Sequence, residues 1–202
     1  MLKNLAQAVS VVFHPIWMPI IGAFILLNHS QLLMLLPNQV HRAIYIIIAS
    51  STIGFPLLML PIFIFRKTFK MFQMTQKQER YIPLFVMAIF YFFSYYTLSR
   101  LNVPGILTGF ILGVFISTLI AAVVSIWWKI SLHGVGLGGI VALLVLILLF
   151  RHGYPEGLFF QALIYTGIVL SARMYLQQHS LLQVVTGFLC GFLTISLTML
   201  IY

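Results

Sequence analysis

The chain has 202 residues, of which 62% are hydrophobic and only 6% charged, and its mean hydropathy is +1.11. Soluble domains are about half apolar, so this composition excludes an ordinary soluble protein and predicts an integral membrane protein. The net charge is +9, but most basic residues flank apolar segments, so we expect membrane lipids as partners and no nucleic acid.

Apolar segments long enough for helical membrane spans follow one another along the chain. They cover residues 5–27, 43–65, 82–98, 105–128, 134–150, 158–176 and 181–202. Each segment is apolar on every side, whereas barrel strands alternate apolar and polar residues. We therefore expect an all-α, polytopic helical membrane bundle of six to seven transmembrane helices, built as a single domain over residues 1–202.

Proline and glycine residues predict bends and close contacts within these helices. The first two helices should bend at their prolines, which are Pro15, Pro19, Pro56 and Pro61. His14 precedes the first of these and is expected to be a kink residue whose polar atoms bond to backbone or water. Two Gly-x-x-x-Gly pairs, 109–113 and 187–191, are expected to serve helix packing.

Short polar clusters interrupt the apolar sequence at residues 77–80, 129–134 and 171–179. Neighbouring clusters are separated by enough sequence for two spans, so the chain returns to the same membrane face each time. The three clusters should therefore form one pocket near that face. The side chains expected to meet there are Arg80, Ser131, His133, Arg173 and His179.

The residues of these clusters are suited to binding a phosphate group. Lys77, Arg80 and Arg173 supply positive charge, while the Ser131 hydroxyl and the backbone N–H near Gly134 supply hydrogen-bond donors. The chain has no Asp, and its only Glu residues are 79 and 156. Mg²⁺ and Ca²⁺ sites depend on carboxylate oxygens, so we expect no metal and no cofactor.

The third cluster has a specific spacing. Ser171-Ala172-Arg173, five further residues, His179 and then Gln183 resembles the last signature of the type 2 phosphatidic acid phosphatase (PAP2) superfamily. In that signature Ser-Arg, five residues, His, three residues and Asp recur. Residues 131–133, Ser-Leu-His, resemble the family's Ser-Gly-His motif, and Lys77 with Arg80 and Pro83 resembles its first motif. The PAP2-like core would cover about residues 66–202.

The resemblance implies a metal-independent phosphatase that acts on a membrane lipid phosphate or diphosphate. His179 would attack phosphorus to give a phosphohistidine, and His133 would protonate the departing alcohol oxygen. Gln183 would hold the other nitrogen of His179, in the place where the family has Asp. Counting of basic residues favours a cytoplasmic site, and we expect a bacterial inner (cytoplasmic) membrane.

The neutral Gln183 side chain leaves two other interpretations open. An amide can keep the correct imidazole tautomer, but it cannot stabilise the positive charge that develops on the ring as a carboxylate would. The chain could therefore be a catalytically weak or inactive PAP2-like protein that binds or transports a phosphorylated lipid. It could also be an unrelated transporter, for which inverted repeats are expected, but none is evident in the sequence.

Overall fold

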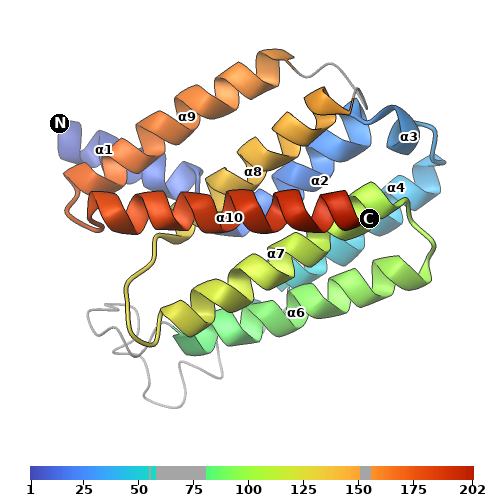
Figure 1. Ribbon diagram of the computed structural model, residues 1–202, viewed down its shortest axis with the longest axis horizontal. Coiled ribbons are helices and arrows are strands. Elements are labelled where there is room, and N and C mark those ends of the chain that lie inside the picture. The colour runs from blue at the N-terminus through green and yellow to red at the C-terminus, as the bar shows by residue number, and fades with distance from the viewer. Residues whose placement is uncertain (55, 58–80, 151–155) are drawn as a thin grey trace.

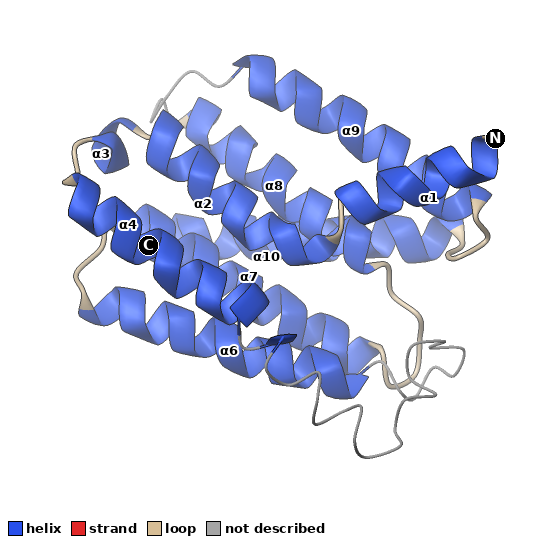
Figure 2. Ribbon diagram, turned by 180° about the vertical axis from the view of Figure 1, so that it is seen from behind, coloured by secondary structure: helices blue, strands red, loops and turns tan. Residues whose placement is uncertain are grey.

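The computed structural model describes residues 1–54, 56–57, 81–150 and 156–202, and these residues form helices and short connections without any strand (Figures 1 and 2). Six helical segments in these ranges are long and apolar enough to cross a membrane. They are Leu2–His29, α6 (Tyr81–Arg100), α7 (Gly105–Val124), α8 (Leu132–Leu149), α9 (Glu156–Tyr175) and α10 (Leu181–Ile201). The predicted all-α polytopic bundle is confirmed, and the chain is an integral membrane protein.

The first span is broken in its middle. Helix α1 (Leu2–Val12) ends before His14, a 3-10 turn (η1) covers Pro15–Trp17, and α2 continues from Met18 to His29. His14 is extended, with φ −63° and ψ 136°, as expected for a residue before proline. Pro19 lies in the first turn of α2, where no backbone N–H is needed.

The second expected span is described only in its first part. After the short helix α3 (Gln31–Met34), α4 runs over Asn38–Ala49 and passes into a π-helix (η2) over Ser50–Gly54. The hydroxyls of Ser50, Ser51 and Thr52 donate to backbone carbonyls three or four residues earlier. Residues 55 and 58–65 of the expected 43–65 segment, including Pro61, lie outside the described residues.

Helix α8 is the central helix of the bundle and packs against α10, α9, α2 and α7. It is apolar on all sides, as a helix surrounded by other helices must be. Its closest neighbour is α10. A Cβ on Gly187 would overlap the Ser131 carbonyl, and a Cβ on Gly191 would overlap that of Val135. The predicted packing role of the second glycine pair is confirmed, and on α7 a Cβ at Gly113 would likewise meet Thr198 of α10.

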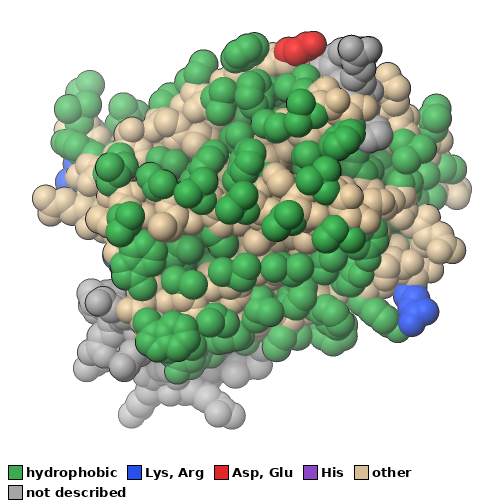
Figure 3. Space-filling view, viewed as in Figure 1, with side chains coloured by type: hydrophobic (Ala, Val, Ile, Leu, Met, Phe, Trp, Pro, Cys, Tyr) green, Lys and Arg blue, Asp and Glu red, His purple; other side chains and the backbone are tan. Residues whose placement is uncertain are grey.

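The outer surface of the bundle is apolar. In the space-filling view, hydrophobic side chains cover the face formed by α9, α10 and α7, and the charged side chains visible there lie at its margins (Figure 3). Large exposed apolar residues on α9 and α10 include Ile164, Ile168, Leu189, Leu193 and Leu197. In an integral membrane protein such residues contact lipid.

The ends of the helices gather at two opposite sides of the bundle (Figures 1 and 2). The amino terminus, the turn between α9 and α10 and the start of α8 lie at one end. The turn between α6 and α7 and the carboxyl terminus lie at the other, where Asn102 has the positive φ of 52° that its side chain tolerates. The second and third polar clusters of the sequence therefore share one end.

Candidate functional site

The starts of α8 and α10 are joined directly. The Ser131 N–H donates to the backbone carbonyl of Gln183, at 3.2 Å. This bond brings the second and third polar clusters together, although the two residues lie 52 positions apart in the sequence. The first cluster, with Lys77, Glu79 and Arg80, lies outside the described residues.

The turn between α9 and α10 is fixed at both ends. At the α9 end, the Gln177 and Gln178 N–H groups donate to the carbonyls of Met174 and Arg173, at 2.9 and 3.1 Å. These two bonds, with Gln177 at a φ of 53°, form a Schellman motif. Glycine is the usual residue at this left-handed position, so the glutamine holds the backbone beside the site in a strained conformation.

At the α10 end, Ser180 and Gln183 form a capping box. The Gln183 N–H donates to Ser180 Oγ at 3.4 Å, and the Ser180 N–H donates to Gln183 Oε1 at 3.2 Å. A sequence pattern of Ser, two residues and Gln before an apolar run could have revealed this cap.

The same Gln183 oxygen lies 3.2 Å from His179 Nδ1. Because a backbone N–H also donates to this oxygen, it must be an acceptor, and so Nδ1 must carry the hydrogen. In the neutral ring the lone pair is then on Nε2. His179 is buried, with an exposed fraction of 6%, and its tautomer is set in the way that a nucleophilic imidazole needs.

Ser131 is the N-cap of α8 and is fully buried. Its Oγ accepts the Gly134 N–H at 3.3 Å. The sequence predicts that this N–H donates to a phosphate group, but in the structure it is directed at Ser131. A Cβ on Gly134 would meet the Val184 carbonyl and Phe188. The absence of a side chain at Gly134 therefore allows α8 and α10 to lie in contact. The Ser131 hydroxyl still has its own hydrogen to donate to a ligand.

His133 is held by the backbone of the first span. Its Nε2 lies 2.9 Å from the carbonyl oxygen of Ser10, and since a carbonyl can only accept, Nε2 carries a hydrogen. The Ser10 carbonyl lies in the last turn of α1, where the chain breaks and the N–H of His14 turns to Val11 instead. His133 thus caps a broken helix, and Nδ1 is the nitrogen through which it would exchange a proton.

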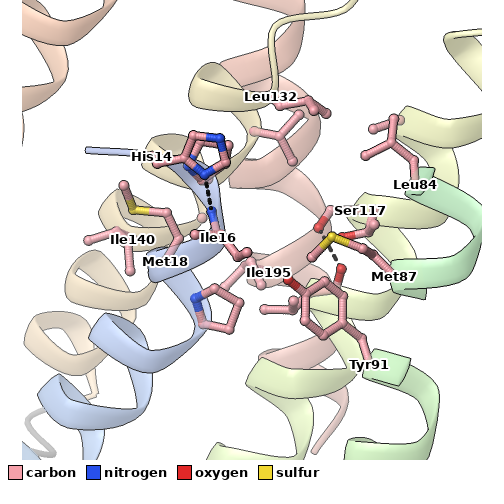
Figure 4. A pocket seen from close by; sticks show the side chains of 18 of the residues that line it. His14, Ile16, Met18, Leu84, Met87, Tyr91, Ser117, Leu132, Ile140 and Ile195 are labelled. Atoms are coloured by element: carbon pink, nitrogen blue, oxygen red, sulfur yellow. Dashed lines mark hydrogen bonds between the residues drawn. The ribbon is translucent and has the colours of Figure 1, made fainter. Parts of the chain in front are cut away.

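His14 belongs to the same group, although the sequence indicated only a kink. The kink role is present, because His14 Nδ1 accepts the Ile16 N–H at 3.3 Å (Figure 4). Its ring also packs edge-on against that of His133, with 5.9 Å between ring centroids. An ionisable residue inside a span is by default a functional candidate, and that signal was available from the sequence.

The positive charge of the described site comes from the end of α9. Arg173 lies in the last turn of α9 and is half-buried, and α9 packs against α1, the helix that precedes His14. Lys129 is half-buried in the connection before α8, where Trp127 is 71% exposed, as expected for a residue at the membrane interface. Ser171, of the third cluster, is exposed.

These residues lie at one end of the bundle, where Gln183 contacts both Ser131 and His179, and where the ring of His133 packs against that of His14. An arginine, three histidines and a serine hydroxyl can bind an oxyanion, and the two buried imidazoles can serve as nucleophile and acid. Comparison with known proteins found no matching family model, no matching curated protein and no matching solved structure.

Proposed function

We propose that this chain is a metal-independent lipid phosphate phosphatase of the PAP2 type, acting through a phosphohistidine on a membrane lipid phosphate or diphosphate. The observation that carries the proposal is the His179 ring, whose Nδ1–H is directed at Gln183 Oε1. This bond keeps a lone pair on Nε2, the nitrogen that the reaction requires. The motif spacing of residues 131–133 and 171–183 supports the same assignment.

The proposed reaction has two steps. In the first, His179 Nε2 attacks phosphorus, the bond between phosphorus and the lipid alcohol oxygen breaks, and His133 protonates that oxygen. In the second, a water attacks the phosphohistidine, the P–N bond breaks, and His133 takes the proton of the water. Arg173 and the Ser131 hydroxyl would stabilise the charge on the phosphoryl oxygens in both steps, together with Lys77 and Arg80.

The geometry makes the role of His133 more specific. Its Nε2–H is directed at the Ser10 carbonyl, and this bond becomes stronger when the ring is protonated. The proton for the leaving oxygen would therefore come from Nδ1. The proposal also requires no metal, because the chain offers only two carboxylates and no Asp.

One observation favours a second function, that of a binding or transport protein for phosphorylated lipids. Gln183 is neutral and already has a structural role in the capping box. Its presence is thus accounted for without catalysis. A chain that had lost turnover would keep Arg173 and Ser131 for binding and would need no carboxylate beside His179.

The test is phosphate release by the purified full-length protein from a panel of lipid phosphates and diphosphates, with excess EDTA present. The phosphatase proposal predicts release, and it predicts a phosphohistidine after rapid acid-free quenching that disappears in His179→Ala. Binding of lipid phosphate without any release would establish the binding function instead. Strict dependence on Mg²⁺ would contradict the proposed metal-independent attack by His179. A bacterial inner membrane, with the site at its cytoplasmic face, is the location we propose.

A further inference from the structure

A cavity of about 130 Å³ lies next to the histidine group, inside the bundle (Figure 4). It is partly open, and it is lined by residues of α2, α6, α7, α8 and α10. The residues that matter here are His14, Leu132, Met87, Tyr91, Val114 and Thr118. Apart from a few hydroxyls and the His14 ring, its walls are hydrocarbon and thioether groups.

The cavity and the polar site share residues. His14 lines the cavity and packs against His133. Leu132 and Val135 of the cavity wall lie one residue before and two residues after His133 in α8. In Figure 4, His14 and Leu132 lie at the upper margin of the cavity, with Tyr91 and Ile195 below them. A molecule with a phosphate beside the His14 and His133 rings could therefore place a hydrocarbon group directly into the cavity.

The shape of the cavity limits what this hydrocarbon group can be. The lining residues of α8 run from Leu132 to Ile140, which at 1.5 Å per residue is a depth of about 12 Å. An apolar cavity of about 150 Å³ accepts a single benzene ring. The present cavity is therefore narrow and has room for one chain segment, not for two acyl chains and a glycerol.

We infer that this cavity binds the first hydrocarbon segment of a single-chain lipid phosphate, that is, the phosphate ester of one long-chain alcohol. The inference rests on the proposed function for the position of the phosphate, and it adds the class of lipid. The phosphate is held at the end of the bundle by Arg173 and the histidines, and the chain runs between α2, α7 and α8. Diacyl lipids would keep their chains outside the bundle.

The test uses ethyl, butyl, hexyl and octyl phosphate, which are soluble in water, and inorganic phosphate as the reference. Affinity for the full-length protein is measured by thermal unfolding in a detergent with a rigid sterol tail, which is too bulky for the cavity. We expect affinity to rise about fourfold for each methylene that the cavity buries, and then to level off. Dibutanoyl glycerol phosphate should bind no better than ethyl phosphate.

Two valines of the same helix provide a matched pair of variants. Val114 lines the cavity, whereas Val123 is 37% exposed on the outside of α7. Val114→Phe should abolish the dependence on chain length and keep the binding of inorganic phosphate, and Val123→Phe should change neither. If Val114→Phe does not fold, Thr118→Leu narrows the same cavity with a smaller change. Chain-length dependence that survives in a folded cavity variant, or equal gain from the diacyl ester, would overturn the inference.

The outcomes also separate this inference from the proposed function. Chain-dependent binding that Val114→Phe removes, without phosphate release from any ester, would leave the cavity assignment standing and refute the phosphatase. Phosphate release at equal rates from all the esters, by wild type and Val114→Phe alike, would leave the phosphatase standing and refute the cavity assignment.

Discussion

The two buried histidines of the site are held in different ways. His133 donates from Nε2 to a backbone carbonyl of α1, whereas His179 donates from Nδ1 to the side-chain oxygen of Gln183. A backbone partner is present whatever residue occupies position 10, but a side-chain partner can be replaced by a single substitution. The structure thus makes His133 a fixed member of the fold and His179 a residue whose chemistry can be adjusted at position 183.

The largest expected effect is that of His179→Ala. If His179 is the nucleophile, turnover should fall by about 10⁴-fold or more, since removal of a covalent nucleophile removes the reaction path itself. Phosphate release from the lipid substrate measures the loss. Binding of inorganic phosphate should change little, because Arg173 remains. Residual turnover near that of wild type would refute the assigned role.

Changes at Gln183 should have the next largest effect. Gln183→Glu keeps the length of the side chain, and so both hydrogen bonds, while adding a negative charge beside the developing imidazolium. We expect Gln183→Glu to raise the rate about tenfold, which corresponds to about 1.4 kcal/mol of transition-state stabilisation. Gln183→Leu removes the acceptor and should reduce the rate about 100-fold or more, because the ring loses its fixed tautomer.

Ser180→Ala is the matched control for the Gln183 variants. It removes the Oγ that caps α10, at a cost of about 1 kcal/mol in stability, but leaves Gln183 Oε1 in place for His179. Turnover should therefore stay near that of wild type. An equal rate loss in Ser180→Ala and Gln183→Leu would show that the cap, and not the imidazole contact, determines the rate.

Substitutions at His133 should mainly lower the free energy of unfolding. His133→Leu leaves the buried Ser10 carbonyl without its side-chain donor, which should lower the free energy of unfolding by about 1–3 kcal/mol. His133→Gln offers an amide donor and should recover part of this loss, although it cannot supply a proton to the leaving group. Thermal unfolding and turnover of the two variants separate the structural from the catalytic contribution. Equal stability of His133→Leu and wild type would contradict the capping role.

The smallest expected effect comes from the turn that carries His179. Gln177 has a φ of 53°, a conformation that costs a non-glycine residue about 1–2 kcal/mol. Gln177→Gly should relieve this strain but also increase the entropy of the unfolded chain, so we expect a net stabilisation of up to about 1 kcal/mol in thermal unfolding. A clear destabilisation would show that the Gln177 side chain makes a contact of its own.

Much of the fold follows from local sequence. The long apolar segments predict the spans to within a few residues, and the tight turn after Arg100 and the break at Pro15 are local as well. The exception is the second expected span, where α4 gives way to a π-helix at Ser50. Periodicity alone does not reveal a change in the pitch of a helix, because the residues stay apolar.

The site was predictable only in part. The sequence indicates that residues 131–133 and 171–179 share an end, but it contains no sign that His133 bonds to Ser10, since that contact joins residues more than a hundred positions apart. The sequence predicts that the backbone near Gly134 approaches a phosphate, but Gly134 packs on α10. Composition cannot distinguish a glycine that admits a ligand from one that admits a neighbouring helix.

The contact between α8 and α10 also has a consequence for biogenesis. Helix α10 is the last described helix in the chain, and its glycine face supplies half of the contact on which the Ser131 to Gln183 bond depends. During synthesis α8 enters the membrane before its partner exists, with the glycines of its first turns facing lipid or other helices. The joined starts of α8 and α10 therefore cannot form stepwise along the nascent chain. This contact forms late in synthesis, when α10 inserts and packs against α8.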